Sequence, residues 1–295
     1  MMDFHGIMTA LVTPFQEDGS VDEQALCALI DHQIAGGVHS LLLLGGTGEY
    51  TCMTPQERRR AVDVSVKAVN GRVPLLVGVL ETGIGECVSF CRYCQQAGAD
   101  ALLVLTPFYF VGDQDALVEF YCTVDRAVEL PILIYNIPYR TNVNVLPDTV
   151  VRLTGEMKHL AGIKECAGLG QAMEVLLKAG DKISVLTGDE FSAVSLLAMG
   201  AKGAVMATAN LVPDAWVRMY DLVQQGSIDR ALSESLRYFP LFKALFSENY
   251  VSPLKYAMAK AGVPGGTRTL LLPLVPPKQA TMDWVEAEMG KLGLV

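Results

Sequence analysis

Short apolar runs alternate with amphipathic stretches along most of the chain. The runs are nearly continuous in apolar residues, which is typical of parallel strands that are covered on both faces. We expect strands at Gly6–Val12, Ser40–Leu44, Leu75–Val79, Ala101–Leu105, Ile132–Tyr135, Leu160–Lys164, Ser184–Thr187 and Gly203–Met206. The 3.6-residue period between them predicts helices such as Asp22–Ala35, Pro55–Val69, Glu86–Gln96 and Asp189–Met199. This alternation predicts an α/β fold, a (β/α)8 TIM barrel.

The barrel pattern ends well before the chain does. We therefore expect a (β/α)8 barrel over residues 1–225 and a C-terminal helical extension over residues 226–295. The extension is mostly helical in pattern, with a Pro/Gly-rich interruption from Val263 to Pro277. No linker or low-complexity stretch in the sequence indicates a second independent domain.

Composition and charge narrow the function classes. The chain has 295 residues, is 51% hydrophobic and carries a net charge of −9, so it lacks the basic field of a nucleic-acid-binding protein. No apolar run approaches the ~18 residues of a membrane span. The N-terminal stretch MMDFHGIMTALVTPF lacks the basic leader and long apolar core of a signal peptide. We expect a cytoplasmic protein without a nucleic-acid or membrane partner.

The cysteines do not indicate a metal site. Their odd number, 7, and scattered positions favour a reducing compartment. Cys91 and Cys94 form a lone C-x-x-C pair, whereas zinc needs two further ligands at a matching spacing. With Cys87 they follow helical spacing, so we interpret them as one packed helix face and predict no metal.

Lys164 is the most informative residue, because it ends the apolar run Leu160–Ile163. Burying an ammonium group costs several kcal/mol or lowers its pKa, and a deprotonated lysine can form a Schiff base with a carbonyl compound. The alternative is a side chain that extends into solvent. Active sites of this fold lie at the C-terminal ends of the strands, where we expect Lys164. Lys182 and Lys202 precede their strands and belong to the opposite face.

Other polar groups follow neighbouring strands. The run Gly45–Glu49 reads GGTGE, and its glycines allow backbone N–H groups to approach an anion such as a carboxylate. Tyr109 ends the run TPFY after the fourth strand, and Tyr135–Thr141 follows the fifth. A phenol can relay protons beside an amine, and Arg140 can clamp a carboxylate. A tight turn, packing tyrosines and a solvated arginine are the alternatives.

After the seventh strand the sequence reads TGDE. We expect Asp189 and Glu190 to lie at a helix N-terminus, where acidic side chains are stabilised without any chemical role.

Taken together, these motifs resemble the dihydrodipicolinate synthase/N-acetylneuraminate lyase family of pyruvate-dependent class I aldolases. The resemblance runs nearly end to end, from LVTPF through GGTGE, TPFY, YNIPYRT, GIKE and TGDE to SPLKYAMAKAG. It implies that Lys164 forms the Schiff base with pyruvate and that Tyr135 shuttles protons. It assigns the pyruvate carboxylate to Thr47 and the backbone of Gly46. Val205 corresponds to a strand-eight position whose backbone carbonyl faces the pyruvate.

The resemblance also bears on the second substrate and on assembly. Arg140 corresponds to the arginine that binds the carboxylate of aspartate semialdehyde, and N-acetylneuraminate lyases usually lack it. The implied activity is therefore that of a 4-hydroxy-tetrahydrodipicolinate synthase, a lyase of lysine biosynthesis. It needs no cofactor, because the imine itself is the electron sink. Tyr109 corresponds to a tyrosine that reaches across a dimer interface, which implies a homo-oligomer, commonly a homotetramer built as a dimer of dimers.

Gly46 departs from the family pattern. The synthases typically carry two adjacent threonines in a GTTGE motif, and the first serves the proton relay. Gly46 has no hydroxyl, and a positioned acid–base group contributes roughly 10²–10⁴-fold to a rate. Either water or another group substitutes, or the acceptor differs. Another 2-oxo acid aldolase or dehydratase, N-acetylneuraminate lyase-like or acting on a 2-keto-3-deoxy sugar acid, is one alternative. A non-catalytic keto-acid-binding relative is the other.

Overall fold

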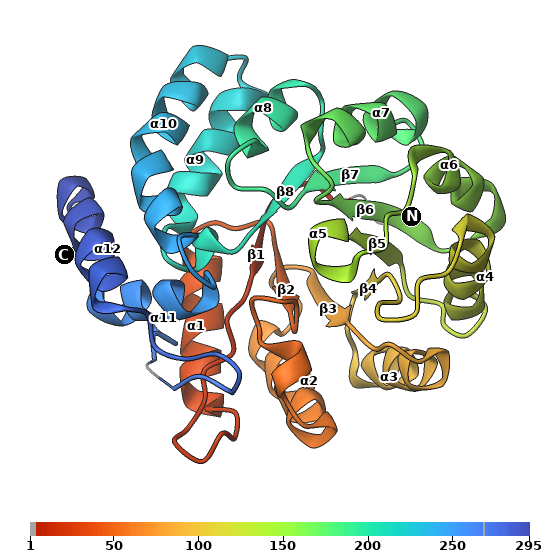
Figure 1. The fold of residues 1–295 in the computed structure, drawn as a ribbon, viewed down its shortest axis with the longest axis horizontal. Coiled ribbons are helices and arrows are strands. Elements are labelled where there is room, and N and C mark those ends of the chain that lie inside the picture. The colour runs from red at the N-terminus through yellow and green to blue at the C-terminus, as the bar shows by residue number, and fades with distance from the viewer. Residues whose placement is uncertain (1–3, 268) are drawn as a thin grey trace.

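The computed structural model describes residues 4–267 and 269–295. Parallel strands form a closed barrel in chain order, β1 to β8, as Figure 1 shows. The strands are β1 Gly6–Ala10, β2 Ser40–Leu43, β3 Leu75–Val79, β4 Ala101–Leu105, β5 Ile132–Asn136, β6 Leu160–Glu165, β7 Ser184–Thr187 and β8 Gly203–Met206. Every strand residue is buried, as the continuous apolar runs predict. The predicted TIM barrel is confirmed.

Helices follow the strands around the barrel (Figure 1). Their bounds are α1 Glu23–Ala35, α2 Pro55–Val69, α3 Ile84–Ala97, α4 Gln114–Asp125, α5 Pro138–Thr141, α6 Pro147–Glu156, α7 Leu169–Ala179, α8 Ala193–Ala198 and α9 Pro213–Gln224. Short 3₁₀ turns lie at Tyr50–Cys52 and Thr208–Asn210. Side-chain caps begin several helices: Asp22 accepts from the Ala25 amide, Thr54 from that of Glu57 and Asp113 from that of Ala116.

The predicted cysteine face is confirmed. Cys87, Cys91 and Cys94 are buried on α3 together with Phe90, and the thiols are free. Burial raises the pKa of Cys94 to about 12, so this thiol stays protonated. No group of His, Cys, Asp or Glu side chains suited to a metal occurs within residues 4–267 and 269–295.

Several predicted elements begin or end one to four residues from the predicted bound, and two of these differences have a clear structural reason. The first strand ends at Ala10 rather than Val12, because the Val12 amide donates to the Asn210 side chain (3.1 Å) instead of continuing the strand. The predicted helix Asp189–Met199 begins only at Ala193, which makes its N-terminal bound wrong.

The two acidic residues before α8 explain its late start. Asp189 accepts from the Phe191 amide at 3.2 Å and forms a tight local turn. Glu190 turns inward and accepts from the backbone amides of Ala207 (2.8 Å) and Thr208 (3.3 Å). Neither acid lies in the first turn of α8, so our expectation of a helix N-terminal role is wrong.

The C-terminal part consists of α10 Ile228–Leu245, α11 Val251–Lys260 and α12 Gln279–Leu292. Helix α10 packs on α9 and α12, and the blue segment of Figure 1 lies beside the barrel near α1. Trp216 of α9 stacks on Phe242 of α10 with ring centroids 5.3 Å apart. The predicted division at residue 225 falls in the turn after α9, and it stays a prediction. Among the described residues, none of the helices is long and apolar enough to cross a membrane.

Candidate active site

Lys164 and Tyr135 lie side by side at the ends of β6 and β5, where they are register partners. The Lys164 Nζ is 3.5 Å from the Tyr135 hydroxyl, a long hydrogen bond, and 4.4 Å from the centre of its ring. Lys164 is only 6% exposed, so its side chain does not extend into solvent. An amine buried beside a phenol is an arrangement that can form an imine and exchange protons.

Gly188, directly after β7, gives the lysine its space. A Cβ at this position would lie 2.4 Å from the Lys164 Cε and 2.4 Å from the Cys166 Sγ. Any other residue type would displace the lysine side chain, because real Cβ atoms do not approach that closely. The close approach of the Lys164 and Cys166 side chains therefore explains why the TGDE motif has a glycine at position 188.

Burial sets the protonation states around the lysine. It raises the pKa of Tyr135 well above its usual range, so the phenol keeps its proton and can donate it. Burial also raises the pKa of Glu190 to about 7, and the charge of Lys164 acts in the opposite direction. The pKa of Cys166 is raised to about 12, again by burial, so that thiol is neutral. The Glu190 carboxyl therefore titrates near neutral pH beside the lysine.

The GGTGE sequence forms a tight turn after β2. The Gly48 amide donates to the Gly45 carbonyl (3.1 Å), and the Glu49 amide donates to the Gly46 carbonyl (3.3 Å). Thr47 is 3% exposed, and its hydroxyl lies 3.1 Å from the hydroxyl of Tyr250. The predicted carboxylate site thus carries a tyrosine from the C-terminal part, which the sequence argument missed.

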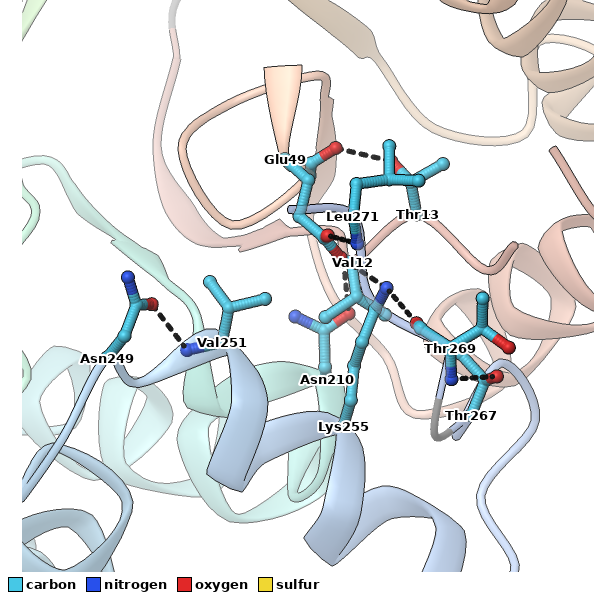
Figure 2. Close-up of polar contacts among 11 residues, drawn as sticks. Val12, Thr13, Glu49, Asn210, Asn249, Val251, Lys255, Thr267, Thr269 and Leu271 are labelled. Carbon is cyan, nitrogen blue, oxygen red and sulfur yellow. Dashed lines mark hydrogen bonds and ion pairs between the residues drawn. The ribbon is translucent and has the colours of Figure 1, made fainter. Parts of the chain in front are cut away.

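Glu49 fixes this turn to the C-terminal part, as Figure 2 shows. Its carboxylate forms a fully buried ion pair with Lys255 of α11 and accepts from the Leu271 amide at 2.9 Å. The Lys255 ammonium also donates to the Thr269 carbonyl at 3.3 Å (Figure 2). Burial lowers the pKa of Lys255, and Glu49 opposes that shift. The ion pair holds α11 and the following segment over the barrel end.

A cavity of about 280 Å³ opens at this end of the barrel. Gly46, Tyr135 and Arg140 line it, so three of the predicted site positions share one space. The remaining lining residues include Glu49, Thr51, Leu80, Leu105, Phe108, Asn249, Pro273 and Leu274. The Arg140 guanidinium lies over the Tyr250 ring, 5.5 Å from its centre. Tyr135 both lines the cavity and contacts Lys164, which connects the amine to this space.

Two further predicted residues, Tyr109 and Val205, are not among those that line the cavity. Tyr109 is 85% exposed in the loop after β4, with a positive φ of 77° and its ring packed against Phe110. Val205 is buried in β8 opposite Met8 of β1. Their proposed roles, an interface contact and a backbone carbonyl facing the substrate, stay predictions.

Comparisons with known proteins place the whole chain in one family. Residues 3–291 match the dihydrodipicolinate synthetase family. A protein from Phenylobacterium zucineum named 4-hydroxy-tetrahydrodipicolinate synthase is 37% identical, with 99% of this chain and 98% of the relative covered. A protein of the same name from Chelativorans is also 37% identical, with 99% of each chain covered.

Solved structures agree as well. The dihydrodipicolinate synthase of Thermotoga maritima superposes with a TM-score of 0.96 at 30% identity, covering all of both chains. YagE from E. coli K12, a protein of the same family solved in complex with pyruvate, gives a TM-score of 0.94 at 26% identity, with 99% of each chain covered. From its sequence match and its fold, this chain belongs to the dihydrodipicolinate synthetase family.

Proposed function

We propose that this protein is a class I aldolase that condenses pyruvate with an aldehyde through a Schiff base, and that it acts as a 4-hydroxy-tetrahydrodipicolinate synthase. The contact of Lys164 with Tyr135, 3.5 Å at adjacent strand ends, carries the proposal. The family resemblance implies the substrate pair, pyruvate as donor and aspartate semialdehyde as acceptor, and the related protein YagE was solved in complex with pyruvate. An intact amine–phenol pair argues against a non-catalytic binding protein.

The first half-reaction joins pyruvate to the enzyme. The Lys164 amine adds to the ketone carbon, and the resulting carbinolamine loses its hydroxyl as water to give an imine. The Tyr135 phenol, kept protonated by burial, supplies the proton for the leaving hydroxyl. Thr47 and the backbone at Gly46 hold the pyruvate carboxylate, where fixed N–H dipoles stabilise negative charge.

The second half-reaction forms the carbon–carbon bond. A methyl proton leaves the imine to give an enamine, whose carbon attacks the aldehyde carbon of the acceptor. Arg140 lines the cavity above this centre and binds the acceptor carboxylate. The guanidinium supplies local positive charge in a protein whose net charge is −9.

A second candidate keeps the same first half-reaction but takes another acceptor. The missing hydroxyl at Gly46 favours it, since the GGTGE turn resembles the sugar-acid dehydratase branch of the superfamily. A panel assay of pyruvate with several aldehydes separates the two. We expect the fastest turnover with aspartate semialdehyde. Turnover of a sugar-derived aldehyde, with none of aspartate semialdehyde, would replace the synthase by the second candidate.

The exposed loop after β4 supports a homo-oligomer. Tyr109, Phe110 and Val111 are 85%, 84% and 59% exposed, and such adjoining apolar side chains commonly mark an interface. We place a dimer contact here, with a dimer of dimers as the full assembly. Sedimentation velocity should give a species larger than a monomer. A fully active monomer at working concentration would refute this assembly.

A further inference from the structure

The space above Gly46 is bordered by two phenols. A Cβ at this position would lie 3.6 Å from the Tyr250 hydroxyl and 4.0 Å from the Tyr135 hydroxyl. Gly46 has no left-handed φ, so the backbone itself does not require glycine. The site therefore lacks a side-chain hydroxyl at residue 46, but a different hydroxyl already faces the same space.

Tyr250 is held firmly in this place. It directly precedes α11, and its ring stacks on Phe246 with centroids 4.8 Å apart and planes within 11°. The Arg140 guanidinium covers the ring, and the hydroxyl lies 3.1 Å from that of Thr47. The buried ion pair of Lys255 fixes α11 to the glycine-rich turn. Ring stacking, a cation and a hydroxyl partner together leave the phenol little freedom.

We propose that the Tyr250 hydroxyl takes the place of the hydroxyl that Gly46 lacks, and passes protons between Tyr135 and the cavity with Thr47 as its partner. This inference rests on the proposed Schiff-base function. Tyr250 acts through Tyr135, so it is a positioning residue for the proton and does not itself touch the reacting carbon.

This route consumes and releases the same number of protons. When the carbinolamine collapses, its C–O bond breaks, the hydroxyl takes a proton from Tyr135 and leaves as water, and the nitrogen lone pair forms the iminium. Tyr135 regains a proton from Tyr250 through a water molecule in the space above Gly46, and Tyr250 regains one from water in the cavity. When the methyl proton then leaves to form the enamine, it returns along the same route. Pyruvate and the amine give enamine and water, and no further reactant is needed.

The test is a substitution pair. Tyr250→Phe keeps the ring, its stack on Phe246 and its contact with Arg140, but removes the hydroxyl. Pyruvate alone is mixed with the enzyme, and imine formation is followed by borohydride quench and mass measurement. At saturating pyruvate we expect roughly a 10²-fold or greater loss in the rate of imine formation, the low end for a positioned acid–base group. Adding Gly46→Thr to Tyr250→Phe should recover most of that rate.

Each outcome decides the inference. An unchanged saturating rate with a weakened apparent pyruvate affinity means that Tyr250 only orients Thr47, and it overturns the proposal. A slow Tyr250→Phe enzyme that neither Gly46→Thr nor Gly46→Ser rescues, with every variant folded by thermal melting, overturns it as well. Wild-type enzyme that forms no pyruvate imine refutes the proposed function itself. If wild-type enzyme traps pyruvate and Tyr250→Phe forms the imine at the same rate, only the proposed role of Tyr250 is overturned.

Discussion

Lys255 of α11 forms a buried ion pair with Glu49 of the turn after β2, across 206 positions of the sequence. The side chains are 1% and 0% exposed, so neither charge is solvated by bulk water. The pair therefore joins the C-terminal part to the turn that carries Gly46 and Thr47. A helix outside the barrel thereby helps to position the active site.

Removing one partner of this ion pair should strongly destabilise the folded protein. In Lys255→Ala the Glu49 carboxylate stays buried without its counter-charge, and we expect a loss of about 3–5 kcal/mol in the free energy of unfolding. Urea denaturation measures it. Lys260→Ala is the matched control on the same helix, because its ion pair with Glu286 is exposed and should contribute less than about 1 kcal/mol. Equal, small losses in both variants would contradict the structural role of Lys255.

Tyr135→Phe should keep the fold and lower turnover by about 10²-fold or more. The phenyl ring still fills its buried site, but the proton donor 3.5 Å from the Lys164 Nζ is lost. Steady-state kinetics gives the turnover number, and circular dichroism checks the fold. If turnover stays at the wild-type level while the chemical step limits the rate, Tyr135 has no part in proton transfer.

Arg140→Ala should act on the acceptor and not on pyruvate. A desolvated, hydrogen-bonded charge pair contributes about 2–5 kcal/mol, which is roughly a 30- to 5000-fold rise in KM for the acceptor. Pyruvate trapping on Lys164 should stay nearly intact. Arg140→Lys is the control, since it keeps the charge but loses the two-point geometry, and its KM should fall between the others. An unchanged acceptor KM in Arg140→Ala would remove Arg140 from acceptor binding.

Glu190 should make stability depend on pH. Burial raises its folded pKa from 4.5 to about 7, so the folded protein binds this proton more tightly than the unfolded chain does. The resulting stabilisation is full below pH 4.5 and is lost as the pH rises through about 7. Glu190→Gln keeps an acceptor for the Ala207 amide but cannot ionise.

Stability of the two proteins can be compared between pH 5 and pH 8. The difference in unfolding free energy, Glu190→Gln minus wild type, should increase over this range, by on the order of 3 kcal/mol. Parallel stability curves for wild type and Glu190→Gln would show that the carboxyl does not titrate in this range.

Local pattern explains which parts of the fold the sequence predicts. Barrel strands such as Leu75–Val79 are buried on both faces, so they appear in the sequence as continuous apolar runs. A charged residue at the end of such a run, such as Lys164, is therefore easy to identify. The bound at Asp189 was wrong for a tertiary reason: Glu190 turns inward to accept from the amides that follow β8. No local pattern distinguishes that acid from a helix-capping one.

The distant partners of the site could not be predicted in the same way. Tyr250 lies 203 positions from Thr47, in a segment whose helical pattern indicates a buried face but not what that face packs against. Lys255 belongs to the helical C-terminal extension, and only the tertiary structure shows it buried against Glu49. Lys255 belongs to the SPLKYAMAKAG segment, and Tyr250 lies just before it. Covariation between this region and the GGTGE turn would have been needed to predict the two contacts.

The central claim is that Lys164 is the amine that binds pyruvate. Enzyme treated with pyruvate and borohydride, digested and analysed by mass spectrometry, tests it most directly. We expect one added pyruvate-derived group per chain, on the peptide that contains Lys164, and none in Lys164→Arg. Lys255, which is also buried, should stay unmodified because Glu49 holds its ammonium. Labelling of Lys255 or another lysine, or none at all in folded wild-type protein, would contradict the Schiff-base mechanism.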